Sequence, residues 1–414
     1  MGIKGLNDLI KKHSNDAFFI MELSKLKGKR VAIDAYGWMF ANMIFCRKKV
    51  INRTDVTLHE IDKYELTKEF LLTITTFVLK WVNNGITPIF VFDGKNKPVE
   101  KNEVKEERYQ KQREKKDKID SLYESIQSDI LANPASLVSD LREALSNYNP
   151  IDREIIESFK VLLDHLGVPW LQADGDAEQL CASLCIEGKV AAVFSNDTDT
   201  LAHGAPLVIT GFSKGYHKNE FGRPTIMLDC VRLDKSLEAL NMNYQTFLDL
   251  CIMCGCDYNN HTNMPGHGAI KSYKLLLPYG NIDKLPKSDK YNISCLNHKR
   301  CREIFGFKSS EQLTIDNTNN TNNTNDNTNN TNNINNNTDN TNDVTVINLD
   351  INKKCFITCQ DYLNKVGIAD QLEKIYGTFQ NFTGSSPGLL EELQLKPINV
   401  ICNYRKPLRL IMVK

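Results

Sequence analysis

Acidic residues follow several short apolar runs of the chain, and their spacing suits the binding of metal ions. Asp197 and Asp199 follow the run "KVAAVFS" at 189–195, with one residue between them. Alternate residues of an extended segment point to the same side, so these two carboxylates would face one position and repel each other. A cation between them would relieve the repulsion, whereas two solvated acids in a surface turn would need none.

Acids of the same kind follow three other apolar runs. Asp34 ends "VAID", Asp93 ends "IFVFD", and Asp176 and Glu178 follow "VPWLQ" where a helix is expected to begin. A single acid at such a place is commonly a turn residue or a helix cap. Acids after four successive runs are harder to explain in that way. If the runs are parallel strands, these ends share one edge of the sheet and the carboxylates meet there.

Such a cluster predicts Mg²⁺ or Mn²⁺ ions. Carboxylates this close do not stay ionised together without cations, and hard oxygen ligands favour these ions over zinc. Two ions about 3.5–4 Å apart can activate water and stabilise the leaving oxygen of a phosphodiester. The cluster is therefore a candidate nuclease centre, although a phosphatase of small phosphoesters would have a similar pattern.

The elements that must position these acids alternate along the chain. Apolar, β-rich runs predict strands, and spacings of three and four between apolar residues at 70–81 and 156–166 predict helices. Alternation of this kind predicts an α/β fold, a mostly parallel twisted sheet flanked by helices, with its site at the C-terminal strand ends. The expected strands are 30–35, 87–92, 168–172, 189–195 and 206–210.

The composition is that of an ordinary globular protein. The 414 residues are 41% hydrophobic and 25% charged, and 51 basic residues balance 51 acidic ones, so net charge names no partner. No apolar run is long enough for a membrane span, and no signal peptide is recognisable. Twelve cysteines in such a chain indicate reduced intracellular thiols.

One group of cysteines invites a zinc interpretation. Cys251, Cys254 and Cys256 lie close together, with His261 and His267 downstream. However, the segment "FLDLCIMCGCDY" is typical of an apolar helix, and no second pair of cysteines follows at zinc-site spacing. We therefore interpret these cysteines as core residues.

Basic segments near the acids favour a nucleic-acid substrate. Residues 95–118 hold ten Lys or Arg against six acids, and Lys101 and Arg108 are seven apart, on one face of a helix just after Asp93. Most of the other charges are expected to form ion pairs on a solvated helix. Gly266 and Gly268 precede a helix that carries Lys271 and Lys274, an arrangement that lets backbone N–H groups approach a phosphate.

The motifs occur in the order found in the flap endonuclease family of structure-specific 5′ nucleases, which the chain resembles. The resemblance runs from residue 1 to about 278 and more weakly to about 376. It implies a PIN-like 5′ nuclease fold with a helical arch and a helix-two-turn-helix. The segments that carry it are "MGIKGLNDLI", "VAIDAYGWMF", "PIFVFDGK", "ADGDAEQLCA", "SNDTDTLAHG", "LCIMCGCDY" and "MPGHGAIKSYKLL".

The resemblance also assigns roles to individual residues. Asp34, Asp93, Asp176 and Glu178 would surround one Mg²⁺, Asp197 and Asp199 would hold a second, and Asp257 would help through water; Mn²⁺ would substitute. Lys101 and Arg108 would be the catalytic basic pair, which polarises the scissile phosphate from the arch. The positions implied to contact DNA are Gly2, Phe40, Arg47, Gly266, Gly268 and Lys271, with K⁺ at the helix-two-turn-helix.

The chain departs from the family pattern at several points. Asp176 stands where the family usually has Glu, and Phe40 replaces a stacking Tyr. One residue is inserted between Asp93 and Lys101, which shifts the register of the basic pair. The sliding-clamp motif, Gln followed by an aliphatic and two aromatic residues, is not visible near the C-terminal end.

These patterns predict the domain organisation. We expect a nuclease core at 1–308, with an arch and cap at 97–150 and the helix-two-turn-helix region at 251–278. An Asn/Thr-rich insertion at 309–343 has nothing to bury and is expected to be disordered. A helical completion of the core is expected at 344–376 and a tail at 377–414.

The predicted function is that of an Mg²⁺-dependent 5′ flap endonuclease, which leaves 5′-phosphomonoesters by a two-metal mechanism in DNA replication or repair. Its partner would be branched DNA, as a 5′ flap or a nicked or gapped duplex, and the protein is expected to be an intracellular monomer. It would act in the nucleus of a eukaryotic cell or at a cytoplasmic viral replication site. A 5′–3′ exonuclease or a junction resolvase is the alternative. An inactive DNA-binding scaffold is disfavoured because all seven expected acids are present.

Overall fold

A computed structural model describes residues 2–14, 16–53, 60–128, 135–150, 152–286 and 291–306, and the backbone of three short strands nearer the C-terminal end. The expectations for 309–343, for 344–376 and for most of 377–414 concern residues outside these ranges, and the proposed domain boundaries stay predictions. No helix in the described part is long and apolar enough to cross a membrane.

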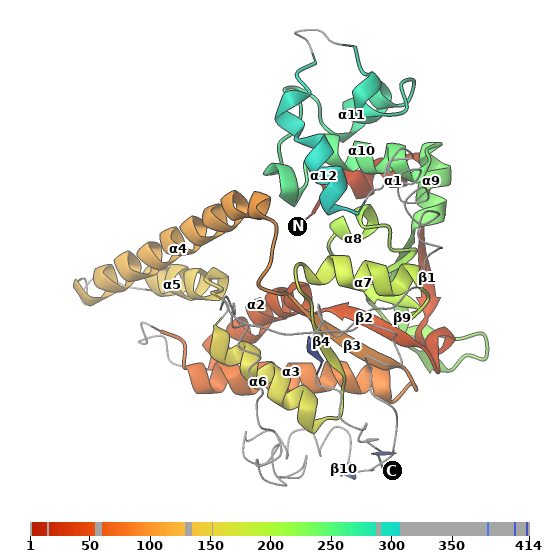
Figure 1. Cartoon of the computed structure of the whole chain (residues 1–414). Coiled ribbons are helices and arrows are strands. Elements are labelled where there is room, and N and C mark those ends of the chain that lie inside the picture. Colours follow the sequence, from red (N-terminus) through yellow and green to blue (C-terminus); the bar gives the residue numbers. More distant parts are fainter. Residues whose placement is uncertain are drawn as a thin grey trace, which may run out of the picture.

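One eight-stranded sheet lies at the centre of the protein (Figure 1). Its strands are β1 (Phe18–Glu22), β2 (Arg30–Asp34), β3 (Thr87–Phe92), β4 (Trp170–Gln172), β5 (Ala192–Phe194), β6 (Leu207–Phe212), β9 (Met227–Arg232) and β11 (Ile401–Cys402). The order across the sheet is β1-β9-β6-β5-β2-β3-β4-β11. The strands from β6 to β4 pair in parallel, whereas β9 and β1 on one edge and β11 on the other are antiparallel. The expected α/β fold with a mostly parallel sheet is confirmed.

Both faces of this sheet are apolar. In β2, Ala32 belongs to the core on one face and Ile33 to the core on the other, and Val91 and Phe92 divide in the same way in β3. Successive side chains of a strand point to opposite faces, so a strand buried on both sides has apolar residues at every position. This explains the continuous apolar runs of the sequence.

Helices cover both faces of the sheet (Figure 1). On the Ile33 face lie α2 (Ala35–Arg53), α3 (Lys63–Val82) and α6 (Arg153–His165). On the other face α7 (Ala177–Ile186) and α9 (Leu233–Leu240) contact the strands. The helices that pack in the same core are α1 (Leu6–His13), α8 (Asp199–Ala202), α10 (Tyr244–Cys254), α11 (Ala269–Leu276) and α12 (His298–Ile304). Short turns of 3₁₀-helix are η1 (Leu23–Leu26), η2 (Val99–Lys101), η3 (Asp257–Asn259), η4 (Ile282–Lys284) and η5 (Ser294–Leu296).

The expected helices at 70–81 and 156–166 are confirmed as parts of α3 and α6. Asp62 caps α3, since its carboxylate accepts hydrogen bonds from the backbone N–H groups of Tyr64 and Glu65. The apolar residues of the predicted stripe in α3 are all buried: Phe70, Ile74, Phe77, Val78 and Trp81.

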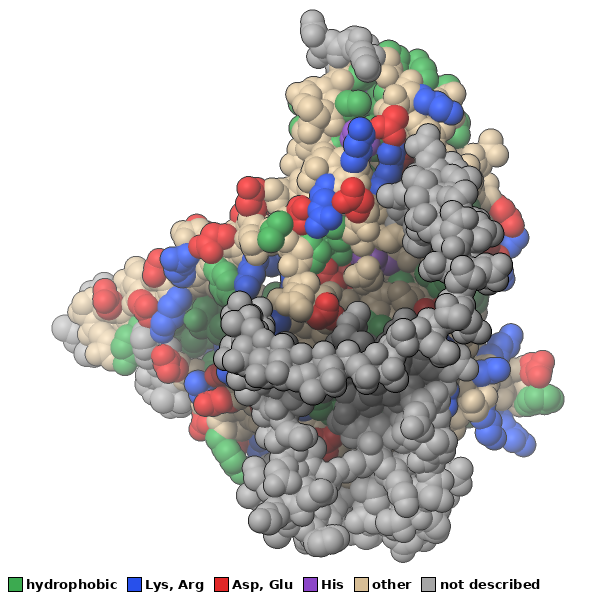
Figure 2. Space-filling model, viewed as in Figure 1, with side chains coloured by type: hydrophobic (Ala, Val, Ile, Leu, Met, Phe, Trp, Pro, Cys, Tyr) green, Lys and Arg blue, Asp and Glu red, His purple; other side chains and the backbone are tan. Residues whose placement is uncertain are grey.

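Two helices project from the body of the protein (Figure 1). They are α4 (Asn102–Ser128) and α5 (Ala135–Asn147), which share a small core with Ile51 of α2. Basic and acidic side chains alternate along their visible surface (Figure 2), and ion pairs such as Lys111 with Glu107 and Lys116 with Asp120 join successive turns. Part of the charges of 95–118 therefore form solvated ion pairs of the kind that the sequence predicts.

Two short pairs of strands complete the described structure. Between β6 and β9 the chain forms a hairpin of β7 (His217–Lys218) and β8 (Pro224–Thr225). A separate two-stranded pair joins β10 (Phe379–Gln380) to β12 (Ile411–Met412).

A buried ion pair joins α10 to α12. Arg302 donates through Nε and Nη2 to the two carboxylate oxygens of Asp249, at 2.7 and 2.6 Å, and Asp249 also accepts from the N–H of Ile282 at 2.9 Å. The side chain of Asp249 is 2% exposed and that of Arg302 is 16% exposed. Removal of one partner would leave an uncompensated charge, which is much costlier than loss of a surface pair.

We therefore expect Arg302→Met to lower the free energy of unfolding by about 3–5 kcal/mol. The matched control is Arg113→Met on α4, because Arg113 and its partner Glu106 are both more than half exposed. The control should cost roughly 0–1 kcal/mol. Urea unfolding measures both, and equal shifts for the two variants would contradict the buried-pair account.

Candidate metal and nucleic-acid site

The parallel strands bring acidic side chains to one edge of the sheet. Asp34 is the last residue of β2, Asp93 follows β3 and Asp197 follows β5. Because β2 lies between β3 and β5, these acids come from adjacent strand ends. Asp176 and Glu178 join them from the start of α7, which follows β4. The edge thus collects acids that lie far apart in the sequence.

Two further acids reach the same cluster from the helices above the sheet. Asp199 is the first residue of α8, and Asp257 begins η3 directly after α10. Both are buried, and the charge of Asp257 acts on Asp197 as well as on Asp199. The structure therefore gathers the seven acids predicted from the sequence into one electrostatic group.

Burial and mutual repulsion raise the pKa values of Asp34, Glu178, Asp197 and Asp199. Burial, and then the charge of Asp93, raises the pKa of Asp34 to about 7. Burial, and then the charge of Asp197, raises the pKa values of Glu178 and Asp199 well above the usual range. Shifts of this kind arise when carboxylates lie together with too little positive charge to balance them.

Local hydrogen bonds fix the orientation of two acids at the strand ends. Asp34 accepts from the N–H of Gly37 at 3.1 Å and from Ser195 Oγ at 3.3 Å. Asp93 accepts through Oδ1 from the N–H of Ala177 at 2.9 Å, which joins the end of β3 to the first turn of α7. The neighbouring strand and helix thus hold each carboxylate in place.

The predicted basic pair lies against this cluster. Lys101 Nζ is 3.0 Å from Asp176 Oδ2 and 3.7 Å from Asp257 Oδ2, and Arg108 Nη2 is 3.1 Å from Asp257 Oδ2. Burial would lower the pKa of Lys101, but the charges of Glu178, Asp176 and Asp257 outweigh it and raise that pKa. The inserted residue before Lys101 therefore does not displace this pair from the acids.

The structure adds a third cation that the sequence patterns did not indicate. Lys97 Nζ lies 2.7 Å from Asp93 Oδ2 and 3.9 Å from Asp176 Oδ1. Lys97 lies four residues after Asp93 in the sequence. That spacing brings the two side chains together only if the backbone turns between them. Hydrogen bonds of Gly94 and Asn96 to the backbone at 174–175 make that turn.

The loop after β3 depends on a close approach of two backbones. The N–H of Gly94 donates to Gly175 O at 2.6 Å, and a Cβ on Gly94 would lie 1.8 Å from Asp174 O. Only glycine fits there, so this crossing fixes how Asp93 and the start of α7 face each other.

The donor set suits a hard divalent cation. Among the described residues, no group of three or more His, Cys, Asp or Glu side chains has a geometry that could hold a metal ion. Of the buried carboxylate oxygens in the cluster, Asp176 Oδ1, Glu178 Oε2 and Asp199 Oδ1 nevertheless have no hydrogen-bond partner, and Asp257 Oδ1 lies 3.0 Å from His261 Nε2. Buried oxygens in this state are costly, and Mg²⁺ or Mn²⁺ prefers such ligands. The residues fit the ions, and ligation by these acids stays a prediction.

Gly2 lies directly against the cluster. Its φ is +90°, and a Cβ at this position would be 2.3 Å from Asp197 Oδ1 and 2.3 Å from Thr198 Oγ1. The next residue, Ile3, donates its N–H to Thr198 Oγ1 at 2.7 Å. A larger residue would displace either the N-terminal segment or Asp197.

Two residues implied to contact DNA lie on α2 beneath the projecting helices. Arg47 is 8% exposed, donates to Leu145 O on α5 at 3.4 Å and lies over the ring of Tyr148. Burial lowers its pKa to about 10. A contact between Arg47 and DNA stays a prediction, and it would require these contacts to be exchanged. Phe40 is partly exposed, and its carbonyl accepts from Asn149 Nδ2 at 3.1 Å.

The glycines before α11 are exposed. Gly266 has φ +74°, and Gly268 is the N-cap of α11. Lys271 donates to Gly266 O at 2.9 Å and is also exposed. Contact of this turn with a phosphate stays a prediction, and no described contact supports the expectation of K⁺.

The cysteines near the site belong to the core. Cys251, Cys254 and Cys256 are buried as free thiols. Burial is the main cause that raises the pKa values of Cys251 and Cys254. These side chains pack as small apolar groups, as their helix pattern indicates.

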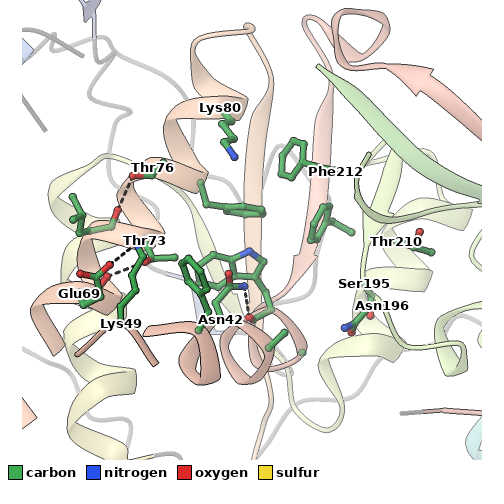
Figure 3. A pocket seen from close by; sticks show the side chains of 17 residues that line it. Asn42, Lys49, Glu69, Thr73, Thr76, Lys80, Ser195, Asn196, Thr210 and Phe212 are labelled. Carbon is green, nitrogen blue, oxygen red and sulfur yellow. Dashed lines mark hydrogen bonds and ion pairs between the residues drawn. The ribbon is translucent and has the colours of Figure 1, made fainter. Parts of the chain in front are cut away.

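A cavity of about 560 Å³ adjoins the wall that carries Asp34 (Figure 3). It is lined by Gly37 and Ser195, which donate to Asp34, and by aromatic side chains such as Trp38 and Phe212. None of the seven acids lines it. The cavity therefore lies beside the carboxylate cluster and is separate from it.

The fold is that of an α/β protein with a carboxylate-rich edge, and sequence matches give the family. Residues 1–118 match the family described as the XPG N-terminal domain, and residues 167–257 match the XPG I-region. Flap endonuclease 1 of Lodderomyces elongisporus is 32% identical over 287 residues, which cover 69% of this chain and 68% of that protein. Flap endonuclease 1 of Candida tropicalis is 34% identical over 285 residues, covering 69% and 70%. The chain belongs to the flap endonuclease family.

Solved structures also align with the chain. Flap endonuclease-1 from Methanococcus jannaschii aligns with a TM-score of 0.43 and 22% identity, covering 70% of this chain and 81% of that chain. The catalytic core of Rad2 in complex with DNA substrate aligns with a TM-score of 0.46 and 18% identity, covering 77% and 79%. The family assignment depends on the sequence matches.

The position of Gly2 yields a test of the site. Mg²⁺ binding can be followed as the rise in Tm that Mg²⁺ induces. We expect Gly2→Ala to need about tenfold more Mg²⁺ than the wild type for half of that rise. The reason is that the added methyl group displaces Asp197, a predicted ligand. Gly28→Ala is the matched control, since Gly28 also has positive φ, +75°, but a Cβ there meets nothing within 4 Å. An unchanged Mg²⁺ response in Gly2→Ala would show that Asp197 is not a ligand or is not held by the N-terminal segment.

Proposed function

We propose that the chain is a structure-specific 5′ flap endonuclease. It would hydrolyse a DNA phosphodiester at a junction of single and double strand and leave a 5′-phosphate and a 3′-hydroxyl. The observation that carries the proposal is the contact between the buried acids and the basic pair at the root of α4. Lys101 and Arg108 lie within 3.1 Å of Asp176 and Asp257, respectively. Family membership of the chain supports the same activity.

The acids would hold two divalent ions, Mg²⁺ or Mn²⁺. Asp34, Asp93, Asp176 and Glu178 would serve one ion, and Asp197 and Asp199 the other, with Asp257 nearby. When bound, the ions supply an activated water and charge stabilisation of the leaving oxygen. The protein's part is to keep the carboxylates buried and oriented, as the hydrogen bonds of Asp34 and Asp93 do.

The basic side chains would exchange partners during the reaction. In the structure Lys101 and Arg108 pair with Asp176 and Asp257. With the carboxylates engaged by divalent ions, the two basic side chains would be free to contact the scissile phosphate. Their donors would then stabilise the negative charge that develops on the phosphate oxygens.

The surrounding elements suggest how the DNA would lie. A single strand would pass the projecting α4–α5 pair, whose root carries Lys101 (Figure 1). The exposed turn at Gly266 and Gly268, with Lys271, would contact the duplex backbone through N–H groups and a charge. The partner would be a 5′ flap or a nicked or gapped duplex. The protein would encounter such DNA where a cell or a virus replicates or repairs its DNA.

A 5′–3′ exonuclease or a junction resolvase would use the same acids. The observation that favours flap cleavage is the projection of α4 and α5 directly from the acidic edge, since it gives a single strand a place beside the metal ligands. An assay with several DNA substrates separates the three activities.

We expect Mg²⁺-dependent incision of a labelled 5′ flap, faster than incision of nicked, gapped or blunt duplexes or of four-way junctions. Asp199→Asn keeps the side-chain volume but removes a charge from the cluster. Its incision rate should fall by more than the roughly 10- to 100-fold typical of residues behind metal ligands. No incision of any branched DNA by the wild-type protein would refute the proposal, and an unaffected Asp199→Asn variant would remove Asp199 from the site.

The role of Lys101 has a separate test. Lys101→Met should lower kcat for flap incision by about 100- to 1,000-fold with little change in KM, because its charge acts on the transition state. Lys111→Met is the matched control, since Lys111 lies on the same projection, is 68% exposed and pairs with Glu107. Equal rates for the two variants would exclude a catalytic role for Lys101.

A further inference from the structure

A chain of hydrogen bonds leads from a buried histidine to one of the predicted metal ligands. His203 Nε2 lies 3.2 Å from Tyr258 Oη, and Tyr258 Oη donates to Asp176 Oδ2 at 2.9 Å. All three residues are at least 95% buried. His203 and Tyr258 both belong to motifs of the sequence, but the spacing of those motifs assigns neither residue a role.

The direction of this chain follows from the protons available. Asp176 as a carboxylate only accepts, so the hydroxyl proton of Tyr258 points to Asp176. The oxygen of Tyr258 then presents a lone pair to His203, which must donate from Nε2–H. His203 Nδ1 has no hydrogen-bond partner, in agreement with this tautomer. Burial lowers the pKa of His203 to about 3.

Packing around the three residues holds this series of hydrogen bonds in place. The ring of His203 lies 4.7 Å from that of Phe305, and the ring of Tyr258 lies 4.9 Å from Phe305. The backbone N–H of His203 also donates to Asp199 O at 2.9 Å. His203 is thus tied to a second predicted ligand through the backbone.

The two oxygens of Asp176 have different surroundings. Oδ2 accepts from Tyr258 and pairs with Lys101 at 3.0 Å, whereas Oδ1 is buried without a hydrogen-bond partner. Rotation about the last side-chain torsion would exchange the two oxygens, and that torsion is broad in the absence of constraints. The Tyr258 hydroxyl supplies the constraint.

We propose that His203 is a positioning residue: it orients the Tyr258 hydroxyl, which holds Asp176 Oδ2 and leaves Oδ1 directed at the divalent ion. The inference rests on the proposed function for the identity of that ion. His203 touches neither substrate nor metal, and it acts through Tyr258. Hydrogen-bond partners behind metal ligands commonly set metal affinity in this manner.

The test compares substitutions that keep the ring packing or restore the donor. His203→Phe retains a flat ring against Phe305 but has no N–H, and His203→Gln places an amide N–H near the position of Nε2. Tyr258→Phe removes only the hydroxyl. The readout that needs no catalysis is the Mg²⁺ concentration that half-saturates the rise in Tm, and the second readout is the Mg²⁺ concentration for half-maximal flap incision.

We expect His203→Phe and Tyr258→Phe each to raise both concentrations by about tenfold, within the range found for such partners. His203→Gln should recover most of the loss. The double variant should resemble the single ones, because residues that act in series are not additive. The Tm of each metal-free variant separates folding from metal binding.

Several results would overturn the inference. One is a His203→Phe variant with a lower metal-free Tm but the wild-type Mg²⁺ response, since His203 would then only pack. Another is a His203→Gln variant as impaired as His203→Phe. A wild-type protein with no Mg²⁺-induced rise in Tm would overturn both this inference and the metal centre. A wild-type protein that binds Mg²⁺ but cuts no flap would contradict the proposed function alone, and the binding comparison would still decide the role of His203.

Discussion

Repulsion among buried carboxylates is the constraint on which the rest of this structure depends. Parallel strands and the start of α7 bring the acids to one edge of the sheet, and burial strengthens every charge interaction there. The protein meets the cost with cations from the segment after β3: Lys97, Lys101 and Arg108. Close backbone contacts at Gly2 and Gly94 exclude larger side chains and keep the acids near one another.

The same charges connect the acidic edge to the parts of the protein proposed to meet DNA. Arg108 on α4 pairs with Asp257 of η3, and Glu100 before α4 pairs with Arg300 on α12 at 2.7 Å. The root of the projecting helices is thus attached to the helices that carry the glycine turn before α11. Ions that replaced the basic side chains at the acids would loosen one of these attachments and free its cations for a phosphate. Metal binding, the position of α4 and DNA contact would then all depend on the charge balance between the buried acids and the basic side chains paired with them.

Features with a local pattern were predictable from the sequence, whereas features that depend on packing were not. The central strands were foreseen because burial on both faces makes them continuous apolar runs. Asp34, Asp93 and Asp197 were foreseen because each follows such a run, whereas the role of Asp257 was implied by the family resemblance. The antiparallel strands β1 and β9 were missed, since half-buried strands of five and six residues have a weak apolar pattern. Lys97 and His203 were missed for another reason. Their roles depend on a turn and on contacts across long sequence separations, which no local spacing reveals. The burial of Arg47 under α5 was hidden for the same reason.

The central claim is that the acidic edge binds divalent ions through these particular carboxylates. The most direct measurement is a titration of the metal-free protein with Mn²⁺, in which electron paramagnetic resonance counts the bound ions. The account predicts two bound ions in the wild-type protein and the loss or marked weakening of one in Asp197→Asn. The exposed acid Asp140 on α5 provides the control substitution, Asp140→Asn, which should bind like the wild type. Absence of bound Mn²⁺ in the wild type, or equal binding by Asp197→Asn, would contradict the account.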